Sequence, residues 1–355
     1  MCELKYLGIF MKTFLVVLLS LLTSSLCAQN NGIWTDPAKA AEEIDYKIQG
    51  EYSGAGLGAQ VIALGDGKFC AVIYEGGLPG AGWVHGNKIV LHGSLEGKKA
   101  SFKAPQGNLS YVNKDASKFS PVRNFPPKSQ KAYSGLISGD SFNVKTHLGE
   151  YKSLKKTVRK SPTLGKKAPE GAMVLFDGSN KDAFNGGRLD EVTKLLNTDG
   201  KDIRTKEKFS NYKMHIEFML PYKPKARGQG RGNSGFYQID HYEVQILDSF
   251  GLEGFDNECG GVYQKANPKV NMCLPPLTWQ TYDVDFTNAV VDESGKVIKH
   301  ARMTVMHNGI VIHDNLELKG KTGGSRGEPV GTPGPMKFQG HGNPVQYRNI
   351  WIIKK

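Results

Sequence analysis

Residues 241–248 alternate between apolar and polar side chains, and they read His241-Tyr242-Glu243-Val244-Gln245-Ile246-Leu247-Asp248. Successive side chains of a β-strand point to opposite faces, so Tyr242, Val244 and Ile246 are expected to face a core. The opposite face then presents Glu243 and Gln245, about 7 Å apart along the strand. A carboxylate and an amide lined up on one face of a sheet suit a sugar-binding groove, although a solvated outer face would show the same pattern.

Five further segments alternate in the same way: Tyr212 to Leu220, Thr281 to Thr287, Ala301 to His307, Ile310 to Asp314 and Gln346 to Ile353. The dipeptide Asn308-Gly309 between two of them is a strong hairpin signal. The pattern predicts one helix in this half of the chain, at Leu189 to Asn197. Many antiparallel strands with almost no helical period predict an all-β fold, in which two antiparallel sheets pack as a sandwich or jelly roll.

The first half of the chain is also rich in short alternating runs. After a helical stretch around Asp36 to Tyr46, the runs are Ala59 to Leu64, Phe69 to Tyr74, Lys88 to His92 and Ala100 to Lys103, separated by glycine-rich turns. This spacing is typical of an antiparallel meander and predicts a small all-β domain. We expect a β-rich domain at residues 29–151, a basic linker at 152–171 and the sandwich domain at 172–355, which should fold on its own.

The composition describes a globular protein, because 39% of the 355 residues are hydrophobic and 23% are charged. The net charge is +12, and residues 152–171 contribute half of it through seven basic residues against one acidic residue. A nucleic-acid partner is therefore not expected, since its binding surface would carry the charge on a folded face interleaved with aromatic residues.

The N-terminus resembles a secretory signal when read from Met11. Lys12 precedes an apolar run from Phe14 to Leu22, and small residues lead to Ala28. The apolar run is too short to span a bilayer, so no integral membrane span is expected. We expect residues 1–28 to be removed and the protein to be secreted or periplasmic. Lipid attachment at Cys27 is the lesser alternative, because the preceding Leu26 is large where a small residue is wanted.

Three cysteines follow the signal segment: Cys70, Cys259 and Cys273. Cys259 and Cys273 could form a disulfide in an oxidising compartment. The alternative is that all three are small buried hydrophobic residues. The sequence contains no cysteine and histidine spacing typical of a zinc site.

Residues 230–235 read Gly230-Arg231-Gly232-Asn233-Ser234-Gly235 and match a dinucleotide-binding pattern. That fingerprint requires a strand before it and a helix after it, whereas a Pro/Lys-rich loop precedes this segment and a strand-like run follows. We therefore reject a dinucleotide site. The segment is expected to be a loop that delivers Asn233, a candidate ligand-binding residue, to the start of a strand.

The C-terminal segment contains two more candidate residues. His341 lies between two glycines on a loop before the last strand, where an imidazole can transfer protons or brace the backbone. Period two then places Gln346, Arg348 and Ile350 on one face, and Tyr347, Asn349 and Trp351 on the other. Arg348 could bind a ligand oxygen or pair with Glu243.

These segments together resemble the 3-keto-disaccharide hydrolase domain family. The matching stretches are Leu175-Phe176-Asp177-Gly178, Gly232-Asn233-Ser234-Gly235, Tyr242 to Asp248, Trp279-Gln280-Thr281-Tyr282-Asp283, Asn308-Gly309, Gly340 to Val345 and Tyr347 to Trp351. The resemblance spans residues 172–355 and implies a concanavalin-like jelly roll exported by bacteria, which cleaves glycosides whose glucose C3 is a ketone. Residues 235–240 depart from the family, where many members carry an arginine. The resemblance does not cover the N-terminal domain.

The implied chemistry agrees with the side chains of the sequence. A C3 ketone acidifies the C2 proton, so a base can start a β-elimination at C1, and water then adds to the enone. A retaining glycosidase would need paired carboxylates, whereas Gln245 and Leu247 occupy those positions. The resemblance implies His341 or Glu243 as base or acid, with Asn233, Gln245 and Arg348 holding the keto sugar. Asp248 and Glu243 could instead hold a divalent cation that polarises the ketone.

A non-catalytic carbohydrate-binding or adhesion module is the rival hypothesis, because the same sheet could bind sugar without reaction. A binding module needs no titrating group, so the His341 loop argues against it. The sequence does not predict the oligomeric state.

Overall fold

We describe a computed structural model of the chain for residues 32–355. Residues 34–355 form one compact unit. The expected signal segment, including Met11 and Cys27, lies outside the described residues. Within the described part of the chain, no helix is long and apolar enough to cross a membrane.

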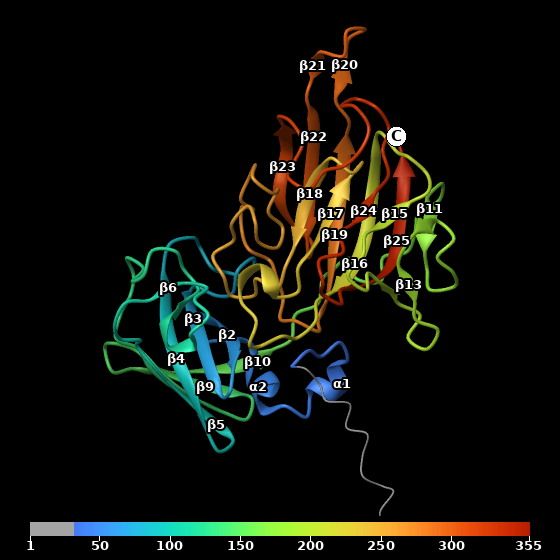
Figure 1. Ribbon diagram of the computed structural model, residues 1–355. Coiled ribbons are helices and arrows are strands. Elements are labelled where there is room, and N and C mark those ends of the chain that lie inside the picture. The colour runs from blue at the N-terminus through green and yellow to red at the C-terminus, as the bar shows by residue number, and fades with distance from the viewer. Residues whose placement is uncertain (1–31) are drawn as a thin grey trace, which may run out of the picture. The chain divides into compact units, whose positions relative to one another are not determined.

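The N-terminal half forms a closed antiparallel barrel of eight strands (Figure 1). Two short helices, α1 (Pro37–Ala40) and α2 (Ile44–Ile48), precede it. The barrel strands are β1 (Gly50–Gly54), β2 (Leu57–Gly65), β3 (Lys68–Glu75), β4 (Lys88–Glu96), β5 (Lys99–Lys103), β8 (Ser134–Ser138), β9 (Ser141–Lys145) and β10 (Tyr151–Thr157). Between β5 and β8 lie β6 (Ser110–Tyr111), a 3-10 turn (Ala116–Lys118) and β7 (Phe119–Ser120). The four strands predicted here are confirmed.

Strand β2 is buried on both of its faces. Ala59, Val61 and Ala63 belong to the core inside the barrel. The alternate residues Ile62 and Leu64 belong instead to the core cluster of the C-terminal half. The barrel therefore packs its outer face against the following half of the chain rather than standing apart from it.

The predicted linker at residues 152–171 is wrong in its first part, because β10 closes the barrel by pairing with β1. Within this strand the side chain of Leu154 is fully buried inside the barrel. Beyond β10, Arg159 Nε donates to Glu51 Oε2 at 2.6 Å, and the buried Ser161 hydroxyl contacts that of Thr281 at 2.6 Å. The basic residues therefore lie on a paired barrel strand and on a docked segment, not on a solvated tether.

The C-terminal half is a sandwich of two antiparallel sheets, as predicted (Figure 1). The larger sheet has the order β13 (Arg188–Leu189), β14 (Leu196–Asn197), β25 (Gln346–Lys354), β16 (Tyr212–Met219), β19 (Trp279–Thr287), β22 (Ala301–His307) and β23 (Ile310–Leu318), with β11 (Met173–Phe176) also paired to β25. The smaller sheet has the order β12 (Phe184–Asn185), β15 (Ile203–Thr205), β24 (Lys337–Phe338), β17 (Ser234–Gln238) and β18 (Tyr242–Ile246). A hairpin of β20 (Val290–Val291) and β21 (Val297–Lys299) and a 3-10 turn (Gly228–Gly230) complete the elements.

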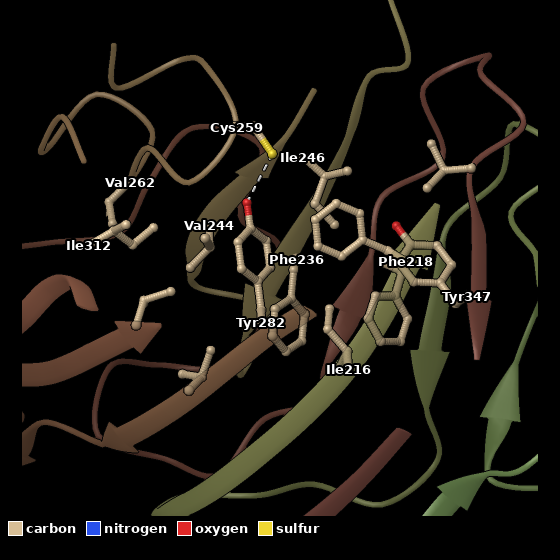
Figure 2. Packing of buried hydrophobic residues seen from close by; sticks show 14 of the residues in the cluster. Ile216, Phe218, Phe236, Val244, Ile246, Cys259, Val262, Tyr282, Ile312 and Tyr347 are labelled. Atoms are coloured by element: carbon tan, nitrogen blue, oxygen red, sulfur yellow. Dashed lines mark hydrogen bonds between the residues drawn. The ribbon is translucent and has the colours of Figure 1, made fainter. Parts of the chain in front are cut away.

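The core between the sheets confirms the faces predicted for residues 242–246. Figure 2 shows Val244 and Ile246 of β18 packed among buried residues that include Phe218 and Tyr282 of the larger sheet. The Tyr282 hydroxyl lies 3.3 Å from Cys259 Sγ. Glu243 and Gln245 therefore project from the face of the smaller sheet that points away from this core.

The three cysteines of the described residues are buried free thiols. Cys273 Sγ contacts the carbonyl oxygen of Leu247 at 3.5 Å, and Cys259 lies against the Tyr282 hydroxyl. This arrangement agrees with the prediction that they act as small hydrophobic residues.

The helix predicted at Leu189 to Asn197 is wrong, because this segment forms the short hairpin of β13 and β14. Asp190 Oδ1 accepts hydrogen bonds from the backbone N–H groups of Val192 and Thr193, at 3.2 and 2.9 Å. The Asp190 N–H donates to the Leu195 carbonyl at 2.9 Å, and Lys194 has a φ of 57°, so the chain turns back after one turn instead of continuing as a helix.

The alternation predicted for Gln346 to Trp351 breaks at Asn349, which has a φ of 46°. Strands β16 and β25 change register opposite this residue. Tyr347 and Ile350 are consequently both buried in the core although three positions separate them. A one-residue bulge of this kind shifts the face of each side chain that follows it.

Candidate functional site

A cleft of about 180 Å³ lies on the face of the smaller sheet that carries Glu243 and Gln245. Strands β17 and β18 form its floor, and loops around residues 229, 263, 323 and 340 form its sides. Its lining residues are Gln229, Asn233, Tyr237, Glu243, Gln245, Tyr263, Gly323, Gly324, Gln339 and His341. The structure therefore brings together four of the six predicted site residues, namely Asn233, Glu243, Gln245 and His341.

Glu243 is the acidic residue among those lining this cleft, and 4% of it is exposed. Burial raises its pKa to about 7, while a hydrogen bond from Tyr237 and the charge of Lys337 act in the opposite direction. The Tyr237 hydroxyl donates to Glu243 Oε2 at 2.8 Å. A carboxyl group that titrates near neutral pH can act as a general base or acid.

The second oxygen of Glu243 occupies space that a glycine leaves open. A Cβ atom placed on Gly235 would lie 2.0 Å from Glu243 Oε1. Gly324, with a φ of 72°, similarly leaves room for Tyr237, whose hydroxyl would lie 2.6 Å from a Cβ there. Glycines from two different segments thus allow the hydrogen-bonded pair of Glu243 and Tyr237 to fit into the cleft wall.

Lys337 lies beneath this pair and is 1% exposed. Its ammonium lies 3.6 Å from the centroid of the Tyr237 ring and 2.6 Å from Asp240 Oδ1. It also donates to the carbonyl oxygen of Gly324 at 2.9 Å. The buried cation therefore fixes the position of Tyr237 and places a positive charge near Glu243.

Burial and the neighbouring Glu243 raise the pKa of Tyr237 above its ordinary value, so the phenol stays protonated and can donate. No role was predicted from the sequence for Tyr237, Lys337 or Gln339. A signal for the last two was present, because period two around the buried Phe338 places Lys337 and Gln339 together on the cleft face. The antiparallel register likewise pairs Tyr237 with Glu243.

Three amide side chains form a hydrogen-bonded group beside Glu243. Gln245 Nε2 donates to Asn233 Oδ1 at 3.2 Å and to Gln229 Oε1 at 3.1 Å. Asn233 Nδ2 also donates to Gln229 Oε1, at 2.9 Å. Amides supply both donors and acceptors, as the recognition of sugar hydroxyl or carbonyl oxygens requires.

His341 is exposed at the edge of the cleft, on the loop between β24 and β25. The preceding Gly340 packs so closely on Lys201 that a Cβ would lie 2.2 Å from the Lys201 backbone. Gly340 N donates to Asp202 Oδ1 at 3.0 Å, and the His341 carbonyl accepts from Asn343 Nδ2 at 3.0 Å. The loop backbone is thus anchored while the imidazole borders the cleft.

Asp248 and Arg348 do not line the cleft, contrary to their predicted roles. Asp248 Oδ2 accepts from Arg231 Nε at 2.6 Å, and Arg231 also donates to the Ala63 carbonyl of the barrel at 3.1 Å. Arg348 Nε donates to Glu217 Oε2 at 2.7 Å on the larger sheet, so its partner is not Glu243. Both residues hold the fold together.

The predicted cation site does not form either, because the carboxylate of Asp248 is engaged by Arg231 while Glu243 binds Tyr237. Within residues 32–355, no group of three or more histidine, cysteine, aspartate or glutamate side chains could hold a metal ion.

The all-β sandwich, with a carboxyl group and amides in a cleft on one sheet, matches a known class of sugar-related domains. Residues 171–353 match the family described as the 3-keto-alpha-glucoside-1,2-lyase-like domain. This match covers half of the chain, and the chain belongs to that family. Its resemblance to the 3-keto-disaccharide hydrolase domains is thereby confirmed, and the protein is a carbohydrate-active enzyme of glycoside hydrolase-like type.

Three solved structures from Parabacteroides distasonis ATCC 8503 are similar to part of the chain, and each is named as a "putative glycosyl hydrolase". The first is 32% identical, covers 53% of this chain and 85% of its own, and has a TM-score of 0.49. The second is 18% identical over 52% of this chain and 95% of its own, with a TM-score of 0.39. The third is 16% identical over 56% and 100%, with a TM-score of 0.33. No curated protein matched the chain.

Proposed function

We propose that the sandwich domain cleaves glycosides whose glucose C3 has been oxidised to a ketone. The observation that supports this proposal is a single buried carboxyl group, Glu243, whose pKa is raised to about 7 by burial. Direct displacement at an acetal uses two carboxyl groups roughly 5–9.5 Å apart. The described residues that line the cleft include one carboxyl group, which suits removal of one acidified proton.

The proposed reaction proceeds in two stages. In the first, Glu243 takes the C2 proton, the electrons of the C2–H bond pass to the ketone as an enolate, and their return breaks the bond from C1 to the leaving oxygen. A proton supplied to that oxygen gives the free alcohol and an enone. In the second stage, water adds its oxygen to C1 and C2 regains a proton, so that the net reaction is hydrolysis.

Five side chains of the cleft have a role in this scheme. Glu243 uses Oε1 as the base, because Oε2 accepts the Tyr237 hydrogen bond. The amides of Asn233 and Gln245 hold the oxygens of the keto sugar and the enolate. His341, exposed at the edge, protonates the leaving oxygen. A positioned base and positioned donors each contribute roughly 10² to 10⁴ in rate. We also propose that the protein is exported, as its N-terminal sequence predicts.

Product analysis tests the proposal directly. The full chain is incubated with a 3-keto-glucoside and, separately, with the unoxidised parent glycoside. We expect release of the aglycone from the keto substrate alone, and in D₂O the released 3-keto sugar should carry deuterium at C2. Cleavage of the parent at a comparable rate, or release without label at C2, would argue against elimination. Binding of sugars without any cleavage would instead support the non-catalytic module.

A further inference from the structure

A second cleft, of about 390 Å³, shares no lining residue with the Glu243 cleft. Three segments of the chain form it: α2 with the start of β1, the end of β10 with the residues after it, and the loop that leads into β19. Its volume falls in the range of small-molecule sites, roughly 300–1,000 Å³. None of the roles assigned above uses it.

The walls of this second cleft are mainly apolar. They include Tyr46 from α2, Leu164 after β10, Pro275 and Pro276 from the loop, and Trp279 at the start of β19. Two successive prolines restrict the backbone of that wall. Flat, stiff apolar surfaces of this kind bind ring systems with little loss of side-chain freedom.

Two features hold the loop wall in place. The guanidinium of Arg348 lies 4.0 Å from the centroid of the Trp279 ring and covers one side of the indole. Leu277 has a φ of 61°, which is costly for a leucine, and its N–H donates to the Leu220 carbonyl at 2.9 Å. Backbone held in such a conformation is often found beside ligand sites.

The charged side chains of the second cleft are mostly cationic. Lys47, Lys156 and Lys160 line it together with the ion pair of Arg159 and Glu51. Glu51 is 1% exposed and Arg159 donates to both of its oxygens, so the carboxylate is neutralised. The charge that remains for a ligand is therefore positive.

Lys156 and the rim of the second cleft also favour a ligand that is both anionic and apolar. The Lys156 ammonium donates to the Lys47 carbonyl, and burial lowers the pKa of Lys156 to about 8. A partly buried ammonium of this kind gains from a nearby anion. At the rim, Val158 is 77% exposed, a large apolar side chain that a bound ligand could cover.

We propose that this second cleft binds a small organic anion built on aromatic rings, such as an aromatic carboxylate or sulfonate. The tyrosine, proline and tryptophan surfaces contact the rings, and the lysines pair with the acidic group. A sugar is disfavoured as the ligand, because its hydroxyl groups need the donors and acceptors that the amides of the Glu243 cleft supply. The inference is independent of the reaction proposed for that first cleft.

The test measures binding to the full chain by isothermal titration calorimetry, with 8-anilino-1-naphthalenesulfonate as the probe. N-phenyl-1-naphthylamine, which has the same rings without the sulfonate, is the neutral comparison. Val158→Asp and Lys160→Glu change exposed residues that line the cleft, so neither should disturb folding. Val192→Asp, at a residue 91% exposed, and Lys319→Glu, with a side chain 75% exposed, are matched controls outside it.

We expect saturable 1:1 binding of the sulfonate that both cleft variants weaken at least tenfold and both controls leave unchanged. The neutral probe should bind at least tenfold more weakly. Absence of saturable binding, or equal losses in the control variants, would overturn the site. Equal affinity for the two probes would overturn the requirement for an anion.

Discussion

Gly235 and Glu243 are fitted to each other across the β17–β18 hairpin, because a Cβ atom at position 235 would lie 2.0 Å from Glu243 Oε1. This oxygen is the one that the Tyr237 hydrogen bond leaves available. Gly235 lies within β17, so its lack of a side chain serves packing rather than a turn. It opens the space in which the proposed base sits.

Gly235→Ala is accordingly expected to displace the Glu243 carboxyl group and to lower kcat by roughly 10² or more, since a misplacement of about 1 Å can cost that much. The methyl group meets a side-chain oxygen rather than backbone, so unfolding should remain cooperative. Steady-state kinetics and a thermal melt measure the two effects. Gly230→Ala is the control, because nothing lies within 4 Å of a Cβ there. Full activity in Gly235→Ala would contradict the placement of the base.

His341→Ala is expected to lower kcat by roughly 10² or more if the imidazole transfers a proton. The side chain is exposed, so the melting temperature should change little. A leaving group of low pKa needs no proton, and the defect should then shrink with an activated aryl 3-keto-glucoside. Loss of stability with no loss of kcat would assign His341 to bracing the loop instead.

The strands and the faces of β18 could be predicted from the sequence because they depend on alternation between near neighbours. Glu243, Gln245 and Asn233 followed from the same pattern, and His341 from its flanking glycines. The pairing of Arg348 could not be predicted, because Glu217 lies on β16, which is far away in the sequence. The burial of Glu243, which sets its pKa, depends on loops from separate parts of the chain.

The errors have local physical causes. A helix was predicted between Leu189 and Asn197, but the left-handed φ of 57° at Lys194 ends the turn that follows Asp190. The lysines around Leu154 suggested a linker because only one apolar residue of β10 faces the barrel core. The bulge at Asn349 reversed the faces predicted for the residues after it in β25. The alternating pattern of the sequence does not show where a strand contains an extra residue.

The fragment 172–355 is expected to fold alone but to be less stable than the full chain. Both sheets lie within it, yet the barrel residues Ile62, Leu64 and Val90 belong to the same core cluster as the sandwich. Without the barrel, the apolar surface of the sandwich that these residues cover becomes exposed to water. This exposure lowers the free energy of unfolding by about 25 cal/mol per Å². Urea unfolding should show one cooperative transition at a lower midpoint. A midpoint equal to that of the full chain would show that the shared core contributes nothing.

Glu243→Gln is expected to inactivate the enzyme and to stabilise it above neutral pH. The pKa of Glu243 is about 7 in the folded protein against 4.5 for the free side chain. Because the folded state holds this proton more tightly, the contribution of Glu243 to stability is fully present below pH 4.5 and is lost as the pH rises through 7. The loss amounts to about 3 kcal/mol above that range.

Urea unfolding at pH 5 and pH 8 measures this effect in the parent and in the variant. The glutamine cannot ionise, so the variant should exceed the parent by more at pH 8 than at pH 5. Glu170→Gln, at an exposed residue, is the control and should show no such difference. An equal change in stability at both pH values would mean that Glu243 does not titrate between them.

Lys337→Met should shift the acidic limb of the pH profile of kcat/KM to higher pH. The proposed base must be ionised, so kcat/KM rises with pH through the pKa of Glu243. Burial raises this pKa, and the Tyr237 hydrogen bond and the Lys337 charge lower it. Removing the cation, which is 1% exposed, therefore raises the pKa further, and a shift of about one pH unit is expected. Methionine fills the space of the lysine stem, and Arg204 remains to pair with Asp240 at 3.0 Å.

Lys337→Arg keeps the positive charge and should leave the limb near its original pH, even if packing against Tyr237 suffers. Lys319→Met, at an exposed lysine, controls for the loss of one positive charge from the whole molecule. A purely structural role for Lys337 would lower kcat/KM at every pH without moving the limb. An unmoved limb in Lys337→Met, measured alongside normal behaviour of both controls, would therefore rule out this lysine as a residue that tunes the base.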